Sequence, residues 1–99
     1  MNEAEAKDRI IMLLSIAEQY AGGEGYKELD AAGTEAIKAL HTRIKLRQKL
    51  QQLEQEANRC YDLANENALY KLEKEEIKWR ARAEAFRDLV GIVKGVLGG

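Results

Sequence analysis

The sequence predicts an all-α fold with a short N-terminal helix, a glycine-rich loop and two long antiparallel helices that form a helical hairpin. Three observations support this fold class. The 99 residues include no proline, and aromatic residues make up only 6%, a composition that disfavours β-sheet. Apolar residues recur at spacings of three and four over long stretches. Charged residues make up 33% of the chain, which is typical of long solvated helix faces. We expect a single helical domain over residues 1–99.

The N-terminal helix is expected within residues 1–21, most clearly from Glu3 to Tyr20. Its apolar residues lie on one broad stripe, and they include Ile10, Leu13, Leu14 and Ala17. Three glycines in four positions, at 22, 23 and 25, then favour the end of a helix. We therefore predict a loop over 22–33, with at most one short helical turn between Lys27 and Ala32.

The first hairpin helix is expected to begin at Thr34, whose hydroxyl is suited to an N-cap. Its apolar residues form a heptad seam, typical of coiled-coil packing, at Leu46, Leu50, Leu53, Ala57, Cys60 and Ala64. The apolar stripe steps sideways between Ile44 and Leu46, which predicts different neighbours for the two halves of this helix.

A second seam follows the same spacing at Leu69, Leu72, Glu76, Trp79, Ala83, Phe86, Val90, Val93 and Leu97. Asparagine is favoured both at left-handed C-terminal positions and at N-caps, so Asn65-Glu66-Asn67 predicts a tight turn near residues 65–67 of a hairpin over 34–97. The alternative is one unbroken helix from Thr34 to Leu97. Since the first helix is too short to cover two seams, we expect a homo-oligomer.

Charge is distributed in blocks of alternating sign. Residues 1–37 carry a net charge of −5, residues 38–49 carry +5 with no acid, residues 50–77 carry −4 and residues 78–99 carry +3. A turn near Glu66 would place the two basic blocks side by side. Their repulsion calls for compensation by the acidic N-terminal helix, by another subunit or by an anionic ligand.

The basic block supplies the candidate anion site, since lysine offers a point charge and arginine a planar fork to a phosphate. An aromatic ring beside an ammonium group would also suit a nucleotide. The candidate residues are Tyr26, Lys27, Lys38, Arg43, Lys45, Arg47 and Lys49. The glycine-rich segment lacks the spacing of a phosphate-binding loop, and the sequence pI of about 5.9 is below that typical of DNA-binding proteins.

The last helix supplies the candidate protein interface, because aromatic anchors dominate the binding energy of interfaces. The candidates are Tyr70, Trp79, Phe86, Val90, Val93 and Leu97. The apolar tail from Leu89 to Leu97 is too short to span a bilayer. It favours docking into the groove of a partner, and no membrane partner is expected.

Catalytic chemistry is not indicated by any motif. His41 has no Cys, Asp or Glu at the spacing of a metal pair, and Cys60 lies in a seam where a thiol is expected to be buried and inert. We expect no enzyme activity, no metal and no cofactor. The single cysteine and the acidic start of the chain favour a cytoplasmic location.

Together these observations predict a small, non-catalytic, intracellular binding protein. It would occupy the surface of a partner protein, as adaptors and inhibitors do, and would self-associate through its seams. The alternative is an oligomeric binder of a nucleotide or nucleic acid that uses the basic block 38–49.

Overall fold

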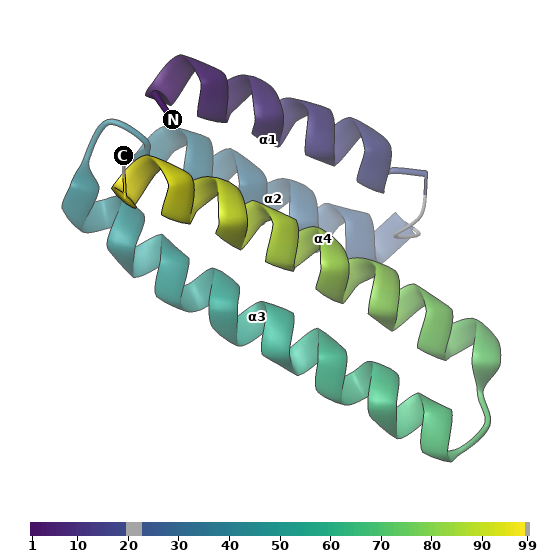
Figure 1. Cartoon of the computed structure of the whole chain (residues 1–99). Helices are drawn as coiled ribbons and strands as arrows, with labels where there is room; N and C mark the ends of the chain where they lie inside the picture. Colours follow the sequence, from purple (N-terminus) through teal and green to yellow (C-terminus); the bar gives the residue numbers. More distant parts are fainter. Residues whose placement is uncertain (20–22, 99) are drawn as a thin grey trace.

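The computed structural model describes residues 1–19 and 23–98 and contains four helices there: α1 (Glu3–Ala17), α2 (Gly23–Ala39), α3 (Arg43–Leu69) and α4 (Glu73–Gly98). Figure 1 shows α3 and α4 as a long antiparallel pair, with α1 and α2 packed on the half of this hairpin away from its turn. The predicted all-α class and the dominant antiparallel pair are confirmed. The described part measures 43 × 22 × 18 Å.

The N-terminal helix α1 begins with a cap. The Glu5 N–H donates to Oδ1 of Asn2 at 2.8 Å, which satisfies one of the backbone donors left open at a helix start. Ala6, Ile10 and Leu14 face the core, and the helix ends at Ala17, before the predicted end. Residues 20–22, where we expected the helix to give way to a loop, lie outside the described residues.

The predicted loop over 22–33 is wrong for residues 23–33, which belong to α2. This helix forms because Leu29 and Ala36, seven residues apart, share a buried face with Leu40. Gly33 lies inside the helix and lets α1 approach, since a Cβ built there would lie 2.9 Å from Cδ1 of Leu14. This glycine therefore permits close packing and does not end a helix.

The helix that we expected to run on from Thr34 is interrupted between α2 and α3. The break lies at residues 40–42, beside the sideways step of the apolar stripe. Thr42 takes the N-cap position of α3 without a side-chain capping bond, whereas the predicted cap, Thr34, lies within α2.

The hairpin turn lies at residues 70–72 and not at 65–67, which are helical. Lys71 has a φ of 58°; its N–H donates to the carbonyl of Ala68, and the N–H of Leu72 donates to the carbonyl of Asn67. This is the Schellman arrangement of a helix C-terminus. The later turn places Glu76 at the exposed end of the hairpin, where it pairs with Arg80 at 3.1 Å. The continuous-helix alternative is excluded.

The core lies between α3 and α4 and extends under α1 and α2. Both predicted seams contribute to it, through Leu46, Leu53, Ala57, Cys60 and Ala64 on α3 and through Ala83, Phe86, Val90 and Val93 on α4. These parts of the seams are buried within one chain. These buried parts are therefore no reason to expect an oligomer.

Candidate binding surfaces

Part of the basic block gathers in a shallow depression between the end of α2 and the start of α3. Lys38, Lys45 and Lys49 line it together with Glu35, and its volume is about 340 Å³. Lys49 pairs with Glu35 at 3.5 Å. No ion pair among residues 1–19 and 23–98 involves Lys38 or Lys45. The depression therefore holds two lysines whose charge the described chain does not compensate by contact.

The two arginines of the block lie elsewhere on α3. Arg43 donates from Nη1 to the carbonyl of Leu97 at 3.2 Å, which places a cation at the negative end of the α4 dipole. Arg47 is exposed and does not line the depression. Arg43 thus stabilises the packing of α4 on α3, and its guanidinium group is directed to the end of α4 and not to the depression.

Tyr26 and Lys27 are not part of the same site. They lie in the first turns of α2, whereas Lys38 lies in its last turn, roughly 16 Å away along the helix at 1.5 Å per residue. Partial burial and the carboxylates of Asp30 and Glu18 raise the pKa of the Tyr26 phenol. The environment of Tyr26 is therefore acidic, and Tyr26 and Lys27 lie apart from the lysines of the basic block.

The two basic blocks meet at the open end of the hairpin, where Arg43 bonds to the carbonyl of Leu97. Because the turn lies at 70–72, the basic residues of α4 face the acidic middle of α3, and Lys94 pairs with Glu54 at 3.2 Å. The start of the basic block also lies near the N-terminus, where Glu3, His41 and Arg43 line one hollow. The later turn thus reduces the repulsion that the predicted turn implied.

Most of the predicted interface residues belong to the chain's own core. Phe86, Val90 and Val93 are buried between the helices, and Leu97 is half-buried at the edge of the core. In this structure they offer little surface to a partner. The seam pattern detected burial, but it did not distinguish packing within one chain from packing between chains.

Trp79 is half-buried and covered by two arginines. The guanidinium carbon of Arg82 lies 4.5 Å from the ring centroid, and that of Arg59 lies 5.7 Å from it. Arg59 also bonds to Glu56 on α3 and to Glu28 on α2, which raises its pKa. The cation–π contact of Arg59 joins α3 to α4, and its ion pair with Glu28 joins α3 to α2.

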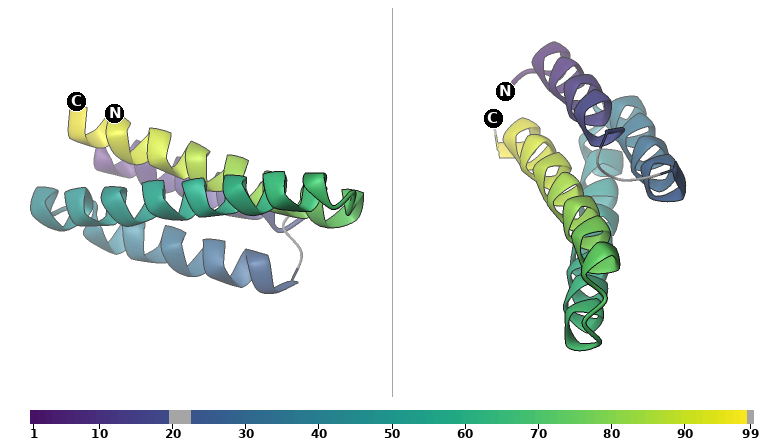
Figure 2. Two further views of the ribbon diagram at one scale, coloured as in Figure 1. Left: turned by 90° about the horizontal axis from the view of Figure 1, so that it is seen from below. Right: turned by 90° about the vertical axis from the view of Figure 1, so that its right-hand side faces the viewer.

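The end of the hairpin carries a group of large, exposed apolar side chains. Leu69 is 82% exposed, Tyr70 70%, Ile77 67% and Leu72 50%. Both views in Figure 2 show this end projecting past α1 and α2. We call these four residues the hairpin tip. Tyr70 was predicted as an interface residue, whereas Leu69 and Leu72 were assigned to the second seam. That assignment followed because the turn was predicted at 65–67, so that residues 69 and 72 were expected within the last helix.

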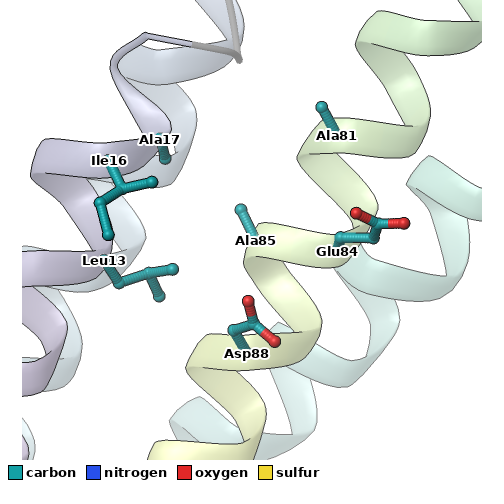
Figure 3. Close-up of a pocket in the computed structure, with 7 residues that line it drawn as sticks. All are labelled: Leu13, Ile16, Ala17, Ala81, Glu84, Ala85 and Asp88. Carbon is teal, nitrogen blue, oxygen red and sulfur yellow. The ribbon is translucent and has the colours of Figure 1, made fainter.

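A groove between α1 and α4 is the second apolar surface, with a volume of about 290 Å³. Leu13, Ile16 and Ala17 line it from α1, and Ala81 and Ala85 line it from α4. Figure 3 shows these side chains on either side of the opening, with Glu84 and Asp88 on the α4 side. The groove thus combines an apolar lining with two carboxylates. No motif in the sequence indicated it.

Cys60 is fully buried beneath α4, as expected, and burial raises the pKa of its thiol. His41 is exposed near the N-terminus. Within residues 1–19 and 23–98, no three His, Cys, Asp or Glu side chains cluster in a way that suits a metal ion. No described helix is both long and apolar enough to cross a membrane.

Comparison of the chain with protein-family models, with curated proteins and with solved structures finds no match.

Proposed function

We propose that this chain is a small, non-catalytic binding module that occupies an apolar pocket on a partner protein through its hairpin tip, in the manner of an adaptor or inhibitor. The supporting observation is the concentration of Leu69, Tyr70, Leu72 and Ile77 at the projecting end of the hairpin. Exposed apolar residues scattered singly are ordinary on a protein surface, whereas a contiguous group is typical of an interaction site.

Hydrogen bonds also hold the backbone of the hairpin tip in one conformation. The Schellman bonds at residues 70–72 hold the turn, and the Asn67 amide donates to the carbonyl of Leu63 at 2.7 Å. A preformed apolar element loses little conformational entropy on binding. Tyr70 supplies a large ring with a polar end, which is the side-chain type that dominates binding energy at interfaces.

Site-specific photo-crosslinking tests this function. A photoreactive phenylalanine analogue at position 70 is expected to capture a discrete partner protein in the cells that produce the chain. The matched control carries the analogue at Gln55, an exposed position in the middle of α3. Leu69→Glu combined with Leu72→Glu should abolish the crosslink from position 70. Equal capture from position 55, or capture that survives these substitutions, would contradict the proposal.

A second candidate function is binding of an anionic ligand such as a nucleotide. It is favoured by the depression where Lys38, Lys45 and Lys49 meet, because two of these lysines have no ion-pair partner in the described chain. Inorganic triphosphate is then expected to raise the melting temperature, and Lys45→Gln with Lys49→Gln should abolish that rise. Lys7→Gln with Lys27→Gln is the matched control. No shift with triphosphate would eliminate this candidate.

A further inference from the structure

One face of α4 is left partly uncovered by the rest of the chain. Helix α1 ends at Ala17, which lines the same groove as Ala81, so the part of this face nearer the turn has no α1 residue beside it. We call this face the α4 stripe. At spacings of three and four, it comprises Lys74, Ile77, Lys78, Ala81, Glu84, Ala85 and Asp88.

The α4 stripe is self-complementary when it is reversed. Counted outward from Ala81, a lysine lies three residues before it and a glutamate three residues after it. Ile77 lies four residues before and Ala85 four after. Lys74 lies seven before and Asp88 seven after. Each lysine on one side of Ala81 therefore matches a carboxylate at the same spacing on the other side, and the large apolar Ile77 matches the small apolar Ala85.

The charges of the α4 stripe are almost unused within the chain. No ion pair among the described residues involves Lys74, Glu84 or Asp88, and Lys78 has one long contact, to Glu75 at 3.7 Å. Ile77 is mostly exposed. Lys74, Glu84 and Asp88, which have no ion pair in the described part of the chain, are therefore available to another surface.

We propose that the α4 stripe is a homodimer interface in which two copies of α4 pack antiparallel about a twofold axis at Ala81. Ile77 of each copy then enters the groove lined by Leu13, Ile16 and Ala85 of the other (Figure 3). Lys78 meets Glu84, and Lys74 meets Asp88, at the acidic side of that groove. Alanine at the crossing point allows the two helix backbones to approach closely.

The order of charges along the α4 stripe favours a second copy of this chain as the partner, and it favours the antiparallel orientation of the two helices. In a parallel arrangement, lysines would face lysines and carboxylates would face carboxylates, which is unfavourable. A stripe of about 15 residues spans roughly 22 Å, so the interface falls at the small end of specific interfaces, and we expect a reversible dimer. The inference goes beyond the binding role proposed for the hairpin tip, and it shares only Ile77 with that tip.

Two charge-reversal variants test the dimer by sedimentation equilibrium. Lys74→Glu with Lys78→Glu makes the α4 stripe wholly acidic, and Glu84→Lys with Asp88→Lys makes it wholly basic. By symmetry each variant turns four attractions into repulsions. Exposed pairs each change an equilibrium by a factor of about 1.5 to 5, so Kd for self-association should rise by about 100-fold in either variant.

Mixing the two variants is the decisive measurement, because the acidic and basic stripes are complementary. An equimolar mixture should form a heterodimer at least as tight as the wild-type homodimer. Lys7→Glu with Lys27→Glu, which applies the same charge change on other helices, should leave the wild-type dimer intact. Circular dichroism is expected to show an unchanged helical fold in all variants, since the substituted side chains are exposed.

Three outcomes would overturn the inference: a wild-type chain that stays monomeric at millimolar concentration, variants that dimerise as the wild type does, or a mixture that stays monomeric. The tip variant with Leu69→Glu and Leu72→Glu separates the two proposals. It should still dimerise while losing its crosslinked partner. Failure of the dimer with crosslinking retained would refute only this inference, and the reverse result would refute only the binding role of the tip.

Discussion

Replacing Gly33 by alanine should destabilise the protein, whereas the same replacement at Gly91 should stabilise it. Both glycines lie inside helices, so each exchange gains about 1 kcal/mol of intrinsic helix propensity. The two sites differ in the space available to the new methyl group. At Gly91 nothing lies within 4 Å of it, but at Gly33 it would lie 2.9, 3.0 and 3.2 Å from Cδ1, Cδ2 and Cγ of Leu14.

The magnitude follows from the response of Leu14. Carbon atoms attract most strongly at about 3.5 to 4.0 Å, so all three contacts at Gly33 are repulsive. Leu14 is buried against the core and must change its rotamer or push α1 away, which costs about 1 to 3 kcal/mol. Gly33→Ala should therefore lower the free energy of unfolding by up to about 2 kcal/mol, while Gly91→Ala should raise it by about 1 kcal/mol.

Urea denaturation followed by circular dichroism measures both values in one experiment. Because the propensity gain is common to both variants, their difference isolates the contact with Leu14. In a Leu14→Ala background the clashing atoms are absent and the new methyl group fills part of a cavity. Gly33→Ala should then become stabilising. If Gly33→Ala stabilises the wild-type chain as much as Gly91→Ala does, the assigned close approach of α1 and α2 is refuted.

Three further predictions concern single residues. Lys71→Gly should raise the free energy of unfolding by about 0.5 to 1 kcal/mol in urea denaturation, because the left-handed backbone at Lys71 is strained for any side chain; a loss of stability would contradict this. Asn2→Ala should lower it by about 1 kcal/mol through loss of the cap on α1, and Asn2→Asp should preserve it. Burial raises the pKa of the Cys60 thiol in the folded state, so the folded chain holds this proton more tightly than the unfolded chain. The buried neutral thiol therefore contributes its full stabilisation below the thiol pKa of the unfolded chain, about 8.5. This stabilisation is lost as pH rises from there through the higher pKa of the folded state. The stability difference between wild type and Cys60→Ala should therefore narrow between about pH 7 and pH 10, and a constant difference would contradict the assigned shift.

The seams show how far the fold follows from the sequence. Leu53, Cys60, Ala83 and Phe86 lie on the predicted seams and are buried, since a spacing of three and four marks one face of any helix. The turn was misplaced because asparagine is the more favourable left-handed residue, yet Lys71 adopts that conformation. Pairing of the two seams, together with the exclusion of Glu76 from the packed region, outweighs the local preference.

The misplaced turn also explains why the candidate sites were only partly predicted. A shift of the turn changes which residues of α3 and α4 face each other, so Lys94 pairs with the acidic Glu54 rather than facing a basic residue. The groove between α1 and α4 depends on contacts far apart in the sequence. Periodicity along one helix carries no information about which neighbour covers it.

Met1 and the last turn of α4 lie near each other at the side of the molecule opposite the hairpin tip (Figure 1). Met1 packs against α4 so closely that a methyl group on Gly95 would lie 3.3 Å from its Cε atom. A fluorescent label, a solid support or a fused domain attached at either end would therefore leave the apolar tip facing outward. Joining the ends by a short peptide and reopening the chain at another loop should likewise be tolerated, because neighbouring surface termini permit circular permutation.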